Sequence, residues 1–173
     1  MGRTYLNLTE SLIPSTTLVS LPSSPGTYAL ILRLDRPTVL QVGCLGEFFF
    51  TAGDFVYLGN AFGPGGLKAR LGRHLRGGAR SHWHIDTLRE VARVTGFCYT
   101  LGPSPLECCW TQRLSNDPGA WFPAPGFGAS DCRGRPARCP AHLLAFSRAI
   151  SAQALSNALG EPGNLPVHSM IQR

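Results

Sequence analysis

The stretch that decides the fold is Thr27–Leu34, with the sequence TYALILRL, which follows the turn residues Ser23-Ser24-Pro25-Gly26. Its aromatic and large aliphatic residues predict a β-strand. Three more β-forming segments follow after short breaks, at residues 38–42, 47–51 and 55–58. Four short strands joined by short connections predict an antiparallel meander.

Helical patterns begin after the glycine-rich residues 59–66. Leu67, Leu71 and Leu75 recur at the spacing of one helix face, which predicts a helix at residues 67–76. Further helices are expected at residues 81–93, 104–114 and 148–159, and further strands at residues 97–101 and 142–146. Residues 117–142 are expected to form an ordered loop region, and residues 161–173 to be loose. The fold class expected is α/β (α+β): a small, mostly antiparallel sheet flanked by three to four helices.

The chain has 173 residues, which is enough for one domain with a real core. We expect an N-terminal lead-in at residues 1–22, the main domain at 23–146, and a C-terminal helix with a tail at 147–173. Its formal net charge is +6, which favours an anionic partner, nucleic acid first. A basic protein without such a partner would have the same charge.

The sequence shows no membrane span, because no apolar stretch approaches the roughly 20 residues required. Residues 1–20 are polar and mixed, so no signal peptide is expected. The chain has six cysteines. Without an export signal, we expect a cytoplasmic protein with reduced thiols.

The helix at residues 67–76 carries polar groups that could act on a phosphate. Arg70 and His74 are four residues apart and therefore share a helix face. Neighbouring basic residues are expected to contact a nucleic-acid backbone, and these are Lys68, Arg73, Arg76 and Arg80. A solvated basic helix is the alternative interpretation.

Two tyrosines and one glutamate complete the set of candidate catalytic residues. Tyr28 and Tyr57 lie near strand ends, where a tyrosine most often packs. Glu107 stands three residues after Ser104, a spacing typical of a capping box. The same glutamate could instead help to hold a magnesium ion together with waters and phosphate.

The order of these residues resembles the GIY-YIG nuclease superfamily. In that superfamily a glycine precedes the first tyrosine, and a second tyrosine opens a Tyr-x-Gly element. A helix then carries an arginine and, four residues later, a histidine or tyrosine, and a later helix carries a glutamate. The matching positions in this chain are Tyr28, Tyr57, Gly59, Arg70, His74 and Glu107.

The resemblance is closest to one uncharacterised prokaryotic subfamily, sometimes found fused to endonuclease-III-like glycosylases. The two tyrosines are 29 residues apart, more than the superfamily's usual spacing, and residues 38–55 are interpreted as an inserted hairpin. Other similar segments are Gly63-Pro64-Gly65-Gly66-Leu67, His82-Trp83-His84-Ile85-Asp86 and Gly126-Phe127-Gly128-Ala129-Ser130-Asp131-Cys132.

The resemblance implies a metal-dependent endonuclease that hydrolyses DNA phosphodiester bonds in repair, recombination or defence. Tyr28 or Tyr57 would activate a water, His74 would help to orient it, and Arg70 would stabilise the phosphate charge. Glu107 would bind one Mg²⁺ or Mn²⁺ ion. The resemblance implies DNA as partner and a link to a base-excision glycosylase. The alternative is a non-catalytic DNA-binding or scaffold domain that retains the fold.

Two further polar groups remain open to more than one interpretation. His82, His84 and Asp86 form either a helix-start network or part of the cleft, to which Gly59 and Asp131 would also belong. Cys132, Cys139 and His142, together with Asp131, resemble zinc ligands in type, but the spacing of the first three residues matches no standard pattern and argues against zinc. We expect Cys132 and His142 to hold a loop over the active site. A metal-stabilised structural domain centred on the three residues is the rival.

Overall fold

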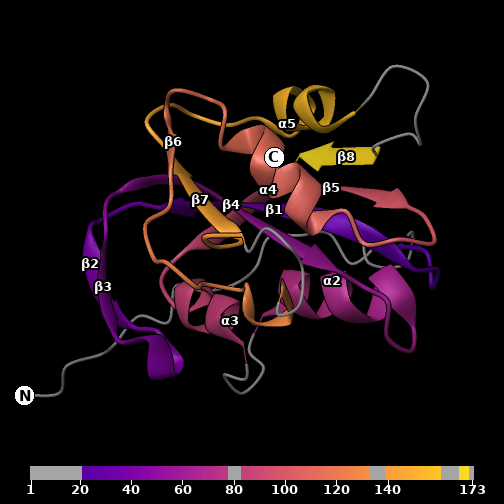
Figure 1. Ribbon diagram of the computed structural model, residues 1–173, viewed down its shortest axis with the longest axis horizontal. Helices are drawn as coiled ribbons and strands as arrows, with labels where there is room; N and C mark the ends of the chain where they lie inside the picture. Colours follow the sequence, from indigo (N-terminus) through magenta and orange to yellow (C-terminus); the bar gives the residue numbers. More distant parts are fainter. Residues whose placement is uncertain (1–20, 78–82, 133–138, 161–167, 172–173) are drawn as a thin grey trace, which may run out of the picture.

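The protein is described by a computed structural model, which covers residues 21–77, 83–132, 139–160 and 168–171. A six-stranded antiparallel sheet in the order β6-β7-β4-β1-β5-β8 forms the centre, and a separate two-stranded hairpin pairs β2 with β3. Helices cover both faces of the sheet (Figure 1). The predicted α/β (α+β) class is confirmed.

The elements have the following bounds. The strands are β1 (Gly26–Leu34), β2 (Thr38–Gln41), β3 (Glu47–Phe50), β4 (Gly53–Asn60), β5 (Arg93–Leu101), β6 (Ala120–Trp121), β7 (Leu143–Phe146) and β8 (His168–Ile171). The α-helices are α2 (Gly66–Arg76), α3 (His84–Arg89), α4 (Glu107–Leu114) and α5 (Ala152–Leu159). Two short 3-10 turns are η1 (Gly43–Leu45) and η2 (Ser130–Cys132). Among the described residues, no helix has the length and apolar character of a membrane span.

Strand β1 is a central strand of the sheet, because it pairs with β4 on one side and β5 on the other. Its residues alternate between two buried faces, as the period of a strand requires. Tyr28 and Leu30 belong to the core cluster beneath α2 and α3, whereas Ala29 and Ile31 belong to the cluster beneath α4 and α5. Figure 1 shows the two helix pairs on opposite sides of the sheet.

The predicted meander is wrong in its pairing, although the inserted hairpin is present. The first and fourth strands pair directly with each other, from Thr27 opposite Asn60 to Leu34 opposite Gly53. Strands β2 and β3 pair only with each other and stand apart from the main sheet (Figure 1). The reason is burial: β1 and β4 are apolar on both faces, while β2 and β3 have one exposed face and cannot occupy the centre of a covered sheet.

Three predicted segments need correction. The helix expected at residues 81–93 is described only from His84 to Arg89, because β5 begins already at Arg93 to pair with β1. The tail expected to be loose contains β8, which pairs with β5. The loop region at residues 117–142 contains the short strand β6, which pairs with β7. In each case, the secondary structure of the segment depends on a strand partner that is distant in the sequence, which local patterns do not reveal.

Candidate functional site

Three of the predicted catalytic residues lie together beneath α2. The rings of Tyr28 and Tyr57 have centroids 6.5 Å apart, and the ring of His74 lies 5.8 Å from Tyr28 and 6.1 Å from Tyr57. They come from β1, β4 and α2, and all three are buried. The leucines of α2 are buried against the sheet, and this packing also places the His74 side chain on the buried side of the helix. The fold therefore joins the two tyrosines to the histidine.

A tryptophan that the sequence reasoning had not singled out completes this cluster. The guanidinium of Arg70 lies 4.7 Å from the centroid of the Trp83 ring, and that of Arg73 lies 4.2 Å from it. The Trp83 ring is also 5.7 Å from His74. Cation–π contacts of this kind hold arginine side chains in place. The signal in the sequence was an aromatic residue between two histidines, just before a helix.

Gly26 and Gly59, the glycines of Gly26-Thr27-Tyr28 and Tyr57-Leu58-Gly59, have a packing role. A Cβ atom on Gly59 would lie 2.5 Å from the Tyr28 hydroxyl and 2.6 Å from its Cζ atom. A Cβ atom on Gly26 would lie 2.3 Å from the carbonyl oxygen of Thr100. Gly59 is also the cross-strand neighbour of Tyr28. The absence of side chains at these positions lets the Tyr28 ring pack directly against β4 and lets β1 approach β5 closely.

Burial controls the protonation of this cluster. It raises the pKa of Tyr28 well above its ordinary value, and the neighbouring Tyr57 raises it further, while the Arg70 guanidinium opposes the shift. Burial lowers the pKa of His74 to about 4, against the opposing effect of Asp86. Both side chains are therefore neutral at pH 7. His74 has an imidazole nitrogen that can accept a hydrogen bond.

Asp86 belongs to the helix-start network. Its carboxylate accepts hydrogen bonds from the Trp83 backbone N–H at 3.1 Å and from Arg73 Nη2 at 2.8 Å. Its Oδ1 atom lies 3.9 Å from His74 Nδ1, too far for a hydrogen bond. Asp86 thus caps α3 and ties it to α2. Arg73, predicted to bind DNA, is held in this ion pair.

His84 holds the loop that follows β6. Its Nδ1 atom accepts a hydrogen bond from the backbone N–H of Gly128, and its ring lies 5.6 Å from Phe127. His82 and Arg80 lie outside the described residues, as does the side chain of Asp131. Of the other predicted DNA contacts, Lys68 and Arg76 are exposed on α2.

Glu107 is the first residue of α4, and the predicted capping box is wrong. The helix has Leu106 at its N-cap, without a side-chain cap. Instead, the Leu106 backbone N–H donates to Thr27 Oγ1 at 2.9 Å, so Thr27 anchors this helix to β1. The Glu107 side chain is only 5% exposed, and its Oε1 atom accepts a hydrogen bond from Asn60 Nδ2 at 3.1 Å.

Glu107 and the tyrosines approach the same strand ends from opposite faces. Thr27 and Asn60 are cross-strand partners whose side chains reach α4, whereas the next residue of β1, Tyr28, faces α2. Asn60 and Gly59 are consecutive residues of β4. The structure therefore brings Tyr28, Tyr57, Arg70 and His74 together, and places Glu107 across the end of the sheet from them.

Unpartnered buried polar atoms concentrate in these residues. Within the described part of the chain, the buried side-chain atoms that make no close hydrogen bond are Tyr28 Oη, Arg70 Nε, both ring nitrogens of His74 and Glu107 Oε2, while the Arg70 guanidinium is near enough to the Tyr28 hydroxyl to lower its pKa. Buried polar groups are nearly always paired, since an unpaired one costs about 1 to 3 kcal/mol. Buried polar atoms without a partner in the protein are typical of functional sites, where a water, an ion or a substrate supplies the partner.

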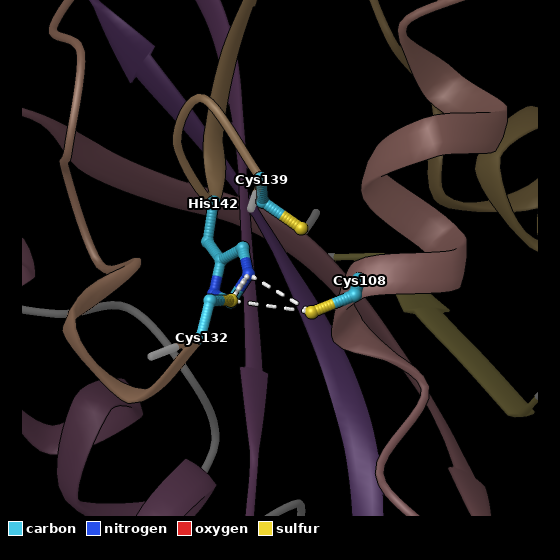
Figure 2. Close-up of side chains that lie close together, drawn as sticks. All are labelled: Cys108, Cys132, Cys139 and His142. Carbon is cyan, nitrogen blue, oxygen red and sulfur yellow. Dashed lines mark hydrogen bonds between the residues drawn. The ribbon is translucent and has the colours of Figure 1, made fainter. Parts of the chain in front are cut away.

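A second group of polar side chains lies beside Glu107. Cys108, Cys132, Cys139 and His142 each offer one ligand atom, and these four atoms lie within 4.8 Å of one another (Figure 2). Burial raises the pKa of all three thiols, and a bound cation would lower it. The four side chains could hold a metal ion. The spacing argument against a metal site left out Cys108, which comes from α4 rather than from the loop.

Comparisons with known proteins show the family and no activity. The chain matches, over residues 27–162, the model of the family described as "Domain of unknown function DUF123". Since this match covers most of the chain, the protein belongs to that family. No curated protein matches the chain, and no solved structure does so.

Proposed function

We propose that this member of the DUF123 family is a metal-dependent endonuclease that hydrolyses DNA phosphodiester bonds, as the GIY-YIG resemblance implies. The observation that carries the proposal is the concentration of unpartnered buried polar atoms in four of the five residues singled out for catalysis. Packing alone does not require these polar atoms, since an apolar side chain would leave no buried polar group unpaired.

In this proposal the phosphodiester lies across the strand ends, where β4 finishes with Gly59 and Asn60. Arg70 would stabilise the negative charge that develops on the phosphate. A tyrosine hydroxyl would orient the attacking water. His74, neutral at pH 7 because its pKa is about 4, would accept a hydrogen bond from that water.

Glu107 fits a site for a hard divalent cation. One carboxylate oxygen is fixed by Asn60 and the other has no partner, so one oxygen is left to bind an ion. Mg²⁺ is usually held by one or two carboxylates together with waters and phosphate oxygens. Glu107 would hold Mg²⁺ or Mn²⁺, whose charge polarises the phosphate and screens the leaving oxygen.

Cleavage assays test this function directly. Wild-type protein is expected to cut branched, nicked or duplex DNA in the presence of Mg²⁺ or Mn²⁺, and Glu107→Gln is expected to bind the same DNA without cutting it. Glutamine keeps the acceptor for Asn60, so the fold should be retained. The matched control is Glu47→Gln, which removes one negative charge from an exposed strand residue and should leave cutting unchanged.

A DNA-binding or scaffold domain without catalysis is the second candidate. The observation that favours it is the position of Glu107 on the opposite face of the sheet from the tyrosines. If wild type and Glu107→Gln both bind DNA and neither cuts, this candidate replaces the nuclease. The resemblance behind both candidates also predicts a link to a base-excision glycosylase, which co-purification from the native host would test.

A further inference from the structure

The side chains of Cys108, Cys132, Cys139 and His142 converge from three segments of the chain. Cys108 lies in the first turn of α4, Cys132 ends η2, and Cys139 and His142 precede β7. Figure 2 shows the four side chains pointing toward one another in the space between α4 and the loop. Their ligand atoms lie within 4.8 Å of one another.

The separations between three of these atoms are within about half an ångström of those around a tetrahedral zinc ion. The Sγ atoms of Cys108 and Cys132 are 3.2 Å apart, and the Nε2 atom of His142 lies 3.1 Å from Cys132 Sγ and 3.7 Å from Cys108 Sγ. Zinc bonds of about 2.3 Å to sulfur and about 2.0 Å to nitrogen place tetrahedral ligands roughly 3.5 to 3.8 Å apart. Small side-chain shifts bring the present separations to these values.

The backbone around the ligands is already held in place. The His142 N–H donates to the Phe127 carbonyl at 2.7 Å, and its own carbonyl accepts from the Leu58 N–H at 2.8 Å. The Cys132 N–H donates to the Ala129 carbonyl at 3.1 Å. Both residues are buried, whereas Cys108 and Cys139 are half-buried. Ligands fixed in advance in this way lose little conformational freedom when a metal binds.

We propose that these four residues form a structural zinc site that ties the loop before β7 to the first turn of α4. Three thiolates and an imidazole are soft and borderline ligands that select Zn²⁺ over Mg²⁺ or Ca²⁺. Four protein ligands leave no open position, which distinguishes a structural from a catalytic zinc ion. The site is separate from the Mg²⁺ or Mn²⁺ site proposed at Glu107, which has a single oxygen ligand.

Metal content and metal substitution test the proposal. Protein purified without chelators is expected to hold one zinc ion per chain by elemental analysis, and cobalt exchange should give the intense visible absorption of a tetrahedral thiolate site. Cys132→Ser should lose both signals. Cys109→Ser, which changes the exposed neighbour of Cys108 on the same helix, should retain both.

Further variants keep the test decisive if Cys132→Ser fails to fold. His142→Cys retains four ligands and should still bind zinc, whereas His142→Ala should bind it at least tenfold more weakly. In wild-type protein, removal of zinc by a strong chelator should lower the melting temperature, and added Zn²⁺ should restore it. Metal-free wild-type protein with an unchanged melting temperature in added Zn²⁺ would overturn the proposal. So would a wild-type Cys108–Cys132 disulfide, detected by mass spectrometry of freshly purified protein.

Discussion

At the scale of single residues, the site depends on the deep burial of groups that normally face water. The His74 ring is held between two tyrosines and Trp83, and its pKa falls to about 4 because burial disfavours the charged form. Among the charged groups around it, Asp86 opposes this shift, and Arg70, Arg73 and Arg89 reinforce it. The unfolded chain, by contrast, titrates near the ordinary value of 6.5.

This difference predicts how stability depends on pH. Between pH 6.5 and about 4, the unfolded state binds a proton at His74 that the folded state excludes, so the free energy of unfolding should fall as the pH falls through this window. The loss should be on the order of 3 kcal/mol, and it should level off below about pH 4. Urea unfolding at a series of pH values measures it.

His74→Gln provides the comparison, because it keeps a polar side chain that does not titrate. The pH dependence of this variant should be shallower than that of wild type. His84, whose pKa is also lowered by burial, contributes to both proteins and cancels in the difference. Identical slopes in the two proteins would mean that His74 is protonated normally in the folded state.

At the scale of elements, the inserted hairpin is joined to the domain through one face only. Phe50 of β3 is fully buried against Phe55 and Phe127, at ring separations of 5.9 and 6.5 Å. On the opposite face, Phe49 and its cross-strand partner Val39 are 60% and 56% exposed. Two adjacent phenylalanines therefore have opposite roles, because successive strand residues point to opposite faces.

Alanine substitutions should separate the two roles. Phe50→Ala is expected to destabilise the protein by about 3 to 5 kcal/mol, since it removes a fully buried aromatic ring. Phe49→Ala should change stability by no more than about 0.5 kcal/mol. Thermal or chemical unfolding of the two variants measures the difference. Equal losses would show that the outer face of the hairpin is covered in solution.

At the scale of the whole molecule, the net charge of +6 favours association with a polyanion. The exposed side chains of Lys68 and Arg76 extend from α2, the helix that also carries Arg70 and His74. Arg73 on the same helix is already engaged by Asp86. Lys68 and Arg76 are therefore the α2 side chains expected to contact the phosphates of a nucleic acid bound at the proposed site.

Salt dependence should reveal these contacts. If Lys68 neutralises one phosphate of duplex DNA, Lys68→Ala should reduce the slope of log affinity against log salt by about 0.9. Arg148→Ala is the matched control, because it also removes one exposed positive charge. Arg148 lies outside α2 and is paired with Asp117. Fluorescence anisotropy at several salt concentrations provides the slopes. An equal change for both variants would place the DNA elsewhere.

Much of this molecule followed from the sequence, because its signals are local. The leucine spacing of α2 predicted its buried face, and the apolar runs of β1 and β4 predicted their strands. Gly59 was marked in the sequence only by the Tyr-x-Gly resemblance, and only the structure shows that it makes room for the Tyr28 ring. Local patterns suffice where an element is specified by its own residues.

The tertiary structure alone decided which segments meet. The sequence could not place Cys108 beside Cys132 and His142, because no fixed spacing links a helix residue to a distant loop. Nor could it show that Glu107 reaches the strand ends from the face opposite the tyrosines, since that depends on which side of β1 receives α4. The sequence alone gives the residue types and the local spacing of apolar residues. The pairing of strands, and the face of the sheet that each helix covers, depend on the burial of the whole core.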